Sequence, residues 1–228
     1  MPFLLLLLLL VLLLFGPQWW VKSVLQRYHR HDEPFPGTAG QLARHLLDRF
    51  GLSDVGVEAA EAGSGDHYDP VQRMVRLSAD KLDRRTLTAV VTAAHEVGHA
   101  IQHAGGYPAF RWRMRLVQLA QVSEKAGSFL YFAVPLLALV TRAPSVGLLL
   151  FLLGLASTGV AVLIQLVTLP VEWDASFSRA MPILEAGYLQ PEQHAAARRI
   201  LQACALTYVA ASLAGLLNFW RWMRLVRR

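Results

Sequence analysis

The chain has 228 residues, of which 54% are hydrophobic and only 17% are charged. Soluble domains carry roughly 25% charged residues, so this composition favours a membrane protein. The formal net charge is +6, and the basic residues lie beside apolar segments without forming a long run. That distribution favours anionic lipid headgroups over nucleic acid as a partner. The single cysteine, Cys204, excludes an intramolecular disulfide and the zinc sites built from several cysteines.

The first segment, residues 3–21, is a leucine-rich run that we predict to be a transmembrane helix. Trp19 and Trp20 close the run and Lys22, Arg27 and Arg30 follow it, an order typical of a membrane–water interface. A secretory signal peptide is the alternative interpretation. No basic residue precedes the run and no small-x-small cleavage site follows it, which argues against a signal peptide.

A polar domain is predicted at residues 22–126. We expect a helix at 38–50, short strands at 55–57 and 71–77, and a loop at 63–70 between the strands. A longer helix is expected over about 83–104, because Gly105 and Gly106 follow it. The arginine-rich stretch at 111–115 is amphipathic and is expected to lie on a membrane surface.

Three further apolar segments, at 127–141, 145–170 and 201–220, are predicted to cross the membrane. A loop or helix at 171–200 separates the last two, and 221–228 form a basic tail. The expected fold is therefore a mainly α, multi-pass integral membrane protein with about four transmembrane helices and one small α+β domain. Basic residues after the first segment and at 179–199 predict a cytoplasmic polar domain, whereas the basic tail argues the other way if the fourth segment crosses fully.

The most informative motif is the run His95-Glu96-Val97-Gly98-His99. In a helix with 3.6 residues per turn, His95 and His99 lie on one face and can share one small cation. Glu96 lies in a neighbouring sector, where a general base for water activation is needed. The pattern H-E-x-x-H is typical of zinc metallopeptidases, and it predicts one Zn²⁺ ion.

A catalytic zinc ion needs a third protein ligand. His103 is excluded, because eight helical residues place it about 12 Å along the axis from His95. Glu172 is our candidate, since two predicted spans return the chain to the same membrane face. A helix-capping role after Pro170 is the alternative for Glu172. Asp174 is the second candidate ligand, or an acceptor that fixes the tautomer of a ligand histidine.

The run Asp-His-Tyr-Asp-Pro at 66–70 has two interpretations. Turn chemistry accounts for all five residues, because Asp side chains and an Asp-Pro pair are turn signals. Alternatively, His67 or Tyr68 lies at the catalytic site and donates a hydrogen bond to the oxyanion of the reaction. The sequence leaves both open.

Several motifs together resemble the bacterial YugP-type zinc-dependent membrane peptidases over nearly the whole chain. They lie in the N-terminal apolar segment and at 66–70, 75–78, 93–103, 165–172 and 205–211. The resemblance implies a zincin-like (gluzincin) domain with His95, His99 and Glu172 as zinc ligands and Glu96 as the catalytic base. The chain departs from the family patterns at two positions. The more distantly similar HtpX-type and CAAX-prenyl endopeptidases usually carry Asp where this chain has Ser176. The YugP-type proteins are expected to have Asn where this chain has Asp174.

We therefore expect a metalloendopeptidase that cleaves peptide bonds of protein or peptide substrates at the membrane surface. A site-2-type intramembrane protease is one alternative, but it needs a metal deep in the bilayer, and Arg84, Arg85 and Arg111 indicate a site near water. A non-catalytic membrane adaptor with a structural zinc ion is the other, and the presence of Glu96 argues against it. The sequence does not indicate the oligomeric state.

Overall fold

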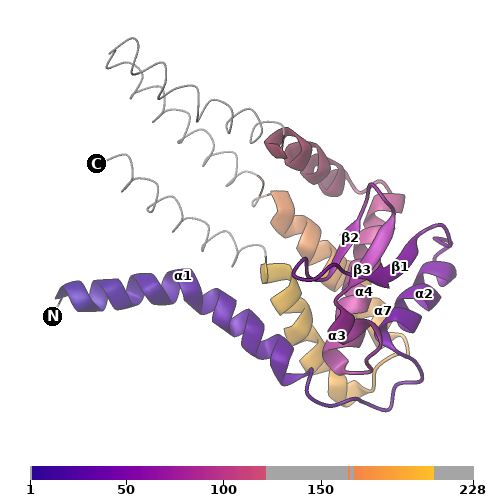
Figure 1. Cartoon of the computed structure of the whole chain (residues 1–228), viewed down its shortest axis with the longest axis horizontal. Coiled ribbons are helices and arrows are strands. Elements are labelled where there is room, and N and C mark those ends of the chain that lie inside the picture. The colour runs from indigo at the N-terminus through magenta and orange to yellow at the C-terminus, as the bar shows by residue number, and fades with distance from the viewer. Residues whose placement is uncertain (1, 122–163, 165–166, 208–228) are drawn as a thin grey trace, which may run out of the picture.

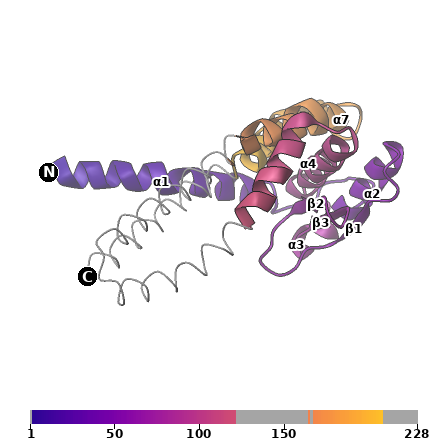
Figure 2. The same cartoon turned by 90° about the horizontal axis from the view of Figure 1, so that it is seen from above.

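The computed structural model describes residues 2–121, 164 and 167–207. The named elements, in chain order, are α1 (Pro2–Arg27), α2 (Ala39–Arg49), β1 (Gly56–Ala59), β2 (His67–Asp69), β3 (Met74–Leu77), α3 (Ala79–Leu82), α4 (Leu87–Ala104), the π-helical η1 (Asp174–Ala180) and α7 (Met181–Glu185). Residues 108–121, 167–173 and 191–207 are also helical. Helix α1 extends away from a body that contains the sheet, α2, α3, α4 and α7 (Figures 1 and 2).

The prediction of about four transmembrane helices is wrong. Across the part of the chain that the structure describes, none of the helices combines the length and the apolar character that crossing a membrane requires. In the predicted span at 3–21, the uninterrupted apolar run is residues 3–15. Thirteen helical residues cover about 20 Å, less than a hydrocarbon core of about 30 Å. Gly16, Pro17 and Gln18 then interrupt the run.

The other predicted spans fall largely on residues that the structure does not describe. The predicted span at 127–141 lies outside the described residues, as do most of 145–170, the larger part of 201–220 and the basic tail at 221–228. The described end of the 145–170 segment belongs to the helix at 167–173, which leads directly into η1.

The sheet has three strands in the order β1-β3-β2. β1 pairs with β3 in parallel, and β2 pairs with β3 antiparallel, so that Val57 and Tyr68 both face Val75 across the ladders. Strand β2 falls inside the expected loop at 63–70, because three residues are too few to produce a recognisable alternation. The hairpin turn between β2 and β3 is held by Asp69, whose Oδ1 accepts hydrogen bonds from the backbone N–H groups of Val71 and Gln72.

Helix α4 lies at the centre of the body, and its residues 87–100 are all buried. It contacts α2, η1, β2 and β3, as expected for a helix with apolar residues on every side. The helix begins at Leu87, four residues after the expected start, because Thr86 caps it by accepting a hydrogen bond from Ala89 N at 3.1 Å. It ends at Gly105 and Gly106, where Gly106 has a φ of 62° that glycine adopts readily.

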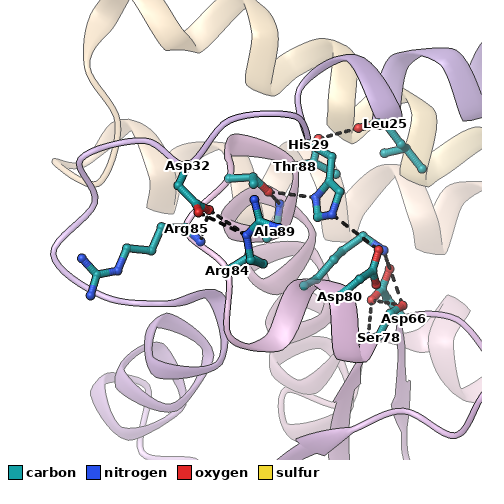
Figure 3. A network of polar contacts seen from close by, with 12 residues as sticks. Leu25, His29, Asp32, Asp66, Ser78, Asp80, Arg84, Arg85, Thr88 and Ala89 are labelled. Carbon is teal, nitrogen blue, oxygen red and sulfur yellow. Dashed lines mark hydrogen bonds and ion pairs between the residues drawn. The ribbon is translucent and has the colours of Figure 1, made fainter.

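Polar contacts join the end of α1 to the first turn of α4 (Figure 3). Thr88 Oγ1 donates to Leu25 O at 2.8 Å, and His29 Nδ1 lies 3.0 Å from Thr86 Oγ1. In the following loop, Asp32 accepts hydrogen bonds from Arg84 Nε and from the backbone N–H of Arg85. The extended helix is therefore fixed to the helix that carries the H-E-x-x-H motif.

Candidate metal centre

Two histidines and one carboxylate converge at the C-terminal half of α4. His95 Nε2 and His99 Nε2 each lie 3.2 Å from Glu172 Oε2. One ligand atom from each of the three residues lies within 4.8 Å of the other two. All three side chains are buried, and Glu172 is 1% exposed. The arrangement brings together two imidazoles one helical turn apart and a carboxylate 73 residues further along the chain from His99.

Close packing of α4 on η1 brings Glu172 to the histidines. Glu172 lies at the end of the helix at 167–173, two residues before the π-helical segment η1. At Gly98, between the two histidines, an added Cβ would lie 2.8 Å from the backbone oxygen of Ala175 in η1. Only glycine permits this approach of the two backbones. Short π-helical insertions are frequent at functional sites, where they change the direction of side chains.

Ser176 determines which nitrogen of His95 carries the proton. Ser176 Oγ lies 3.1 Å from His95 Nδ1 and donates its own hydrogen to Leu201 O at 3.2 Å. Because the hydroxyl hydrogen is used, His95 Nδ1–H is the donor in the first contact. The lone pair of His95 Nε2 therefore faces Glu172 Oε2, as a metal ligand requires.

A longer chain of hydrogen bonds orients His99. Its Nδ1 lies 2.9 Å from Gln102 Oε1, which can only accept, so His99 Nδ1–H is the donor. Gln102 Nε2 donates to Val171 O at 2.8 Å and to Asp174 Oδ2 at 2.7 Å, and Arg179 Nε donates to the same carboxylate oxygen at 2.7 Å. Asp174 is thus outside the group of converging ligands and acts on His99 through Gln102.

The two buried glutamates have opposite electrostatic environments. Burial raises the pKa of Glu96 to about 7, and the negative charges of Glu172 and Asp66 add to this, against the effect of His95. Burial also raises the pKa of Glu172, but hydrogen bonds and charges from His99 and His95 outweigh it and lower the pKa below its usual value. Glu172 is therefore held as a carboxylate, whereas Glu96 exchanges a proton near neutral pH.

Arg113 approaches the second oxygen of Glu172. Its Nη1 lies 3.2 Å from Glu172 Oε1 in an ion pair, and the Arg113 side chain is 17% exposed. The geometry is not that of a hydrogen bond, and Oε1 accepts none from the described residues. The guanidinium attracts Oε1 while Oε2 faces the histidines, an arrangement that favours a single-oxygen metal contact.

The residues of the 66–70 run lie in and around strand β2. His67 Nδ1 is 3.1 Å from Gly65 O, within its own loop. Tyr68 is 8% exposed, and its hydroxyl lies 2.9 Å from His103 Nδ1. The ring of Phe110 lies 5.6 Å from that of His103 and 6.2 Å from that of His99, measured between centroids. Tyr68 and His103 thus belong to an aromatic cluster beside the candidate metal ligands.

The donor set fits zinc. Two imidazoles and one carboxylate leave a fourth tetrahedral position for water, which is the usual composition of a catalytic zinc site. The contacts that orient the two histidines fit zinc as well. The Nδ1 atoms of His95 and His99 are both hydrogen-bonded, so both Nε2 lone pairs are directed toward Glu172. A harder cation such as Mg²⁺ prefers oxygen ligands and is disfavoured by two histidines.

Comparison with known families agrees with this site. Residues 3–227 match the family described as "Putative neutral zinc metallopeptidase". The chain belongs to this family. Its cofactor is zinc, because the family and the cluster of His95, His99 and Glu172 point to the same ion. The YugP-type resemblance inferred from the sequence is thereby confirmed.

A relative in this family comes from Bacillus subtilis (strain 168) and is named "Putative membrane protease YugP". It is 34% identical over 223 residues, which cover 98% of this chain and 96% of the relative. No solved structure matches the chain.

Sequence reasoning missed three residues of the site: Ser176, Gln102 and Arg113. Ser176 follows Glu172 by four residues and Gln102 follows His99 by three, so helical periodicity places both on the ligand-bearing faces. This helical spacing could have identified both Ser176 and Gln102 from the sequence. Arg113 lies in the helix at 108–121, and no spacing rule relates that helix to Glu172.

Proposed function

We propose that the chain is a zinc-dependent endopeptidase in which His95, His99 and Glu172 bind the metal and Glu96 is the general base. The convergence of the two Nε2 atoms on one oxygen of Glu172 is the observation that carries the proposal. Glu96 is 6% exposed and directly follows a ligand on α4, which supports its role. The proposed catalytic unit comprises residues 22–126 together with 171–200.

In this proposal, bound zinc supplies a Lewis acid that polarises the scissile carbonyl and makes water acidic enough to react near neutral pH. The Glu96 carboxylate accepts a proton from the attacking water and then donates it to the leaving amine. A pKa near neutrality suits a group that must both accept and donate. Ser176 and Gln102 hold the histidine rings in position throughout.

We further propose Tyr68, in preference to His67, as a donor to the oxyanion of the reaction. Tyr68 is buried and joined to His103 beside the ligands, whereas His67 is bonded within its loop. A phenolic O–H that is already ordered can turn toward a developing negative charge at little cost.

We also propose that the enzyme acts on protein or peptide substrates at the membrane surface. The B. subtilis relative is named a membrane protease. In this chain, Trp19 and Trp20 are 58% and 40% exposed on α1, and aromatic side chains of this kind favour the membrane–water interface. Lys22, Arg27 and Arg30 next to them support the cytoplasmic face. Labelling of a cysteine introduced at position 30 by an impermeant reagent in intact cells would contradict that face.

Hydrolysis of casein or of a peptide library by the purified chain tests the function. We expect cleavage that a chelator abolishes and that added zinc restores. A chain that contains zinc but cleaves no peptide bond, with or without the chelator, would favour the non-catalytic adaptor. Chelator-resistant cleavage would exclude a metallopeptidase.

A further inference from the structure

A cleft of about 410 Å³ lies between α1 and the helix at 191–207. The two helices run beside each other at the end of α1 that meets the body (Figure 1). None of the residues that line the cleft belongs to the metal centre. Its volume falls within the range of about 300–1,000 Å³ that is usual for small-molecule sites, so it can hold more than a single ion.

The cleft is lined from both helices by cationic, aromatic and hydrogen-bonding groups. Helix α1 contributes Trp20, Ser23, Val24 and Arg27, whose spacing places them on one helical face, and Tyr28 directly follows the helix. The other helix contributes Arg199 and Gln202, three residues apart and therefore also on one face.

Positive charge in the cleft is not neutralised by the protein that surrounds it. No lining residue is acidic, and neither Arg27 nor Arg199 forms an ion pair with any residue that the structure describes. The guanidinium of Arg27 lies 5.8 Å from the centre of the Tyr28 ring, a cation–π contact that orients the guanidinium without neutralising its charge. The neighbouring Arg198 differs, because its Nη2 is bonded to Glu185 at 2.7 Å.

We propose that this cleft binds a phosphate-bearing anion through Arg27 and Arg199. Two guanidiniums can each present a pair of N–H donors to phosphate oxygens. Gln202 and Ser23 add neutral hydrogen-bonding groups, and Trp20 covers the apolar part of the ligand. The same chemistry fits the headgroup of an anionic lipid and a free phosphate monoester.

Binding of two probes by the purified, zinc-loaded chain tests the proposal. One probe is glycerol 3-phosphate, followed by calorimetric titration. The other is a phosphatidylcholine vesicle with or without phosphatidylglycerol, followed by co-sedimentation. We expect Arg27→Gln and Arg199→Gln each to weaken binding of the phosphate-bearing probe about tenfold, because each variant loses a charge-assisted hydrogen bond. Gln202→Glu, which adds negative charge to the cleft, should weaken binding similarly.

Arg30→Gln and Arg198→Gln are the matched controls, because each removes one positive charge close to the cleft without changing its lining. Both should bind within about twofold of the parent, as exposed charges contribute little singly. Zinc content should be the same in all five variants, which separates this site from the metal centre and verifies folding.

The two probes distinguish the sources of the phosphate. Cleft-dependent binding of phosphatidylglycerol vesicles alone identifies a lipid headgroup, and cleft-dependent binding of glycerol 3-phosphate alone identifies a free phosphate compound. Equal losses in the cleft variants and the control variants would overturn the proposal, since they would indicate attraction by net charge only. Absence of binding to both probes would also overturn it.

Discussion

At the scale of single residues, the proposed zinc site depends on groups that are not among its candidate ligands. His95 and His99 are each fixed through Nδ1, by Ser176 and by Gln102. The more distant peptidases that the sequence resembles usually carry Asp where Ser176 stands. Here a neutral hydroxyl takes the acceptor position, and its hydrogen is given to Leu201 O. A neutral acceptor raises the basicity of a ligand histidine less than a carboxylate does.

Replacing Ser176 by alanine tests this account of His95. The Ser176→Ala chain should stay folded but bind zinc about 10- to 100-fold more weakly, as is usual when the outer partner of a ligand histidine is lost. Competition with a zinc indicator measures the affinity. Ser178→Ala, at an exposed position two residues on, is the control and should bind zinc like the parent. Equal zinc affinities for the two variants would show that Ser176 does not contribute to zinc binding.

At the scale of elements, the contact between α4 and η1 decides whether the three proposed ligands meet. Gly98→Ala would gain helix propensity of about 1 kcal/mol in an isolated helix. Here the added Cβ meets the Ala175 backbone at 2.8 Å, and such overpacking costs about 1–3 kcal/mol. We expect a lower unfolding midpoint and weaker zinc binding, measured by thermal denaturation and zinc titration.

Gly16 provides the comparison for that variant, because a Cβ added there meets no atom within 4 Å. Gly16→Ala should leave the stability unchanged or raise it. An increase in stability and unchanged zinc affinity for Gly98→Ala would show that the close approach of α4 and η1 is not required.

The β2–β3 hairpin gives a prediction about pH. Burial raises the pKa of Asp69, but hydrogen bonds from Gln72 N, Arg76 and Val71 N outweigh it and lower the pKa. A lowered pKa means that the contribution to stability is present above the usual pKa of an aspartate and is lost as the pH falls through the folded-state value. Asp69→Asn should therefore lower the free energy of unfolding by about 1 kcal/mol at neutral pH, and by less below about pH 4.

Chemical denaturation of both proteins across this pH range measures the difference. Asp54→Asn removes a more exposed ion pair with Arg73 and serves as the control, with a smaller effect expected at neutral pH. If the loss of unfolding free energy caused by Asp69→Asn became larger as the pH falls, the lowered pKa of Asp69 would be contradicted.

At the scale of the whole molecule, local signals and long-range packing differ in how well the sequence encodes them. The positions of His95, Glu96 and His99 on one helix follow from periodicity alone, and Glu172 followed from topology together with a family resemblance. The prediction of Glu172 used a two-span hairpin that lies largely outside the described residues. In the structure Glu172 lies beside His95 and His99, where the prediction placed it, whereas the hairpin used to reach that position stays a prediction.

Other features could not be read from the sequence, for identifiable physical reasons. Strand β2 is three residues long and gives no alternation. The π-helical turn at η1 has no sequence signature of its own, yet it begins two residues after Glu172. The cleft between α1 and the helix at 191–207 depends on the packing of two segments that are far apart in the chain. Hydropathy also predicted a span at 3–21, whereas none of the described helices, α1 included, is long and apolar enough to cross a membrane.

The central claim is that one protein binds zinc through His95, His99 and Glu172 and uses Glu96 as its base. The most direct test measures the zinc content and the peptide hydrolysis of the Glu96→Gln protein side by side with the parent. We expect equal zinc per chain and a rate lower by about two to four powers of ten, the usual contribution of general acid–base catalysis. Cleavage by Glu96→Gln at the parent rate, with equal zinc, would contradict the account.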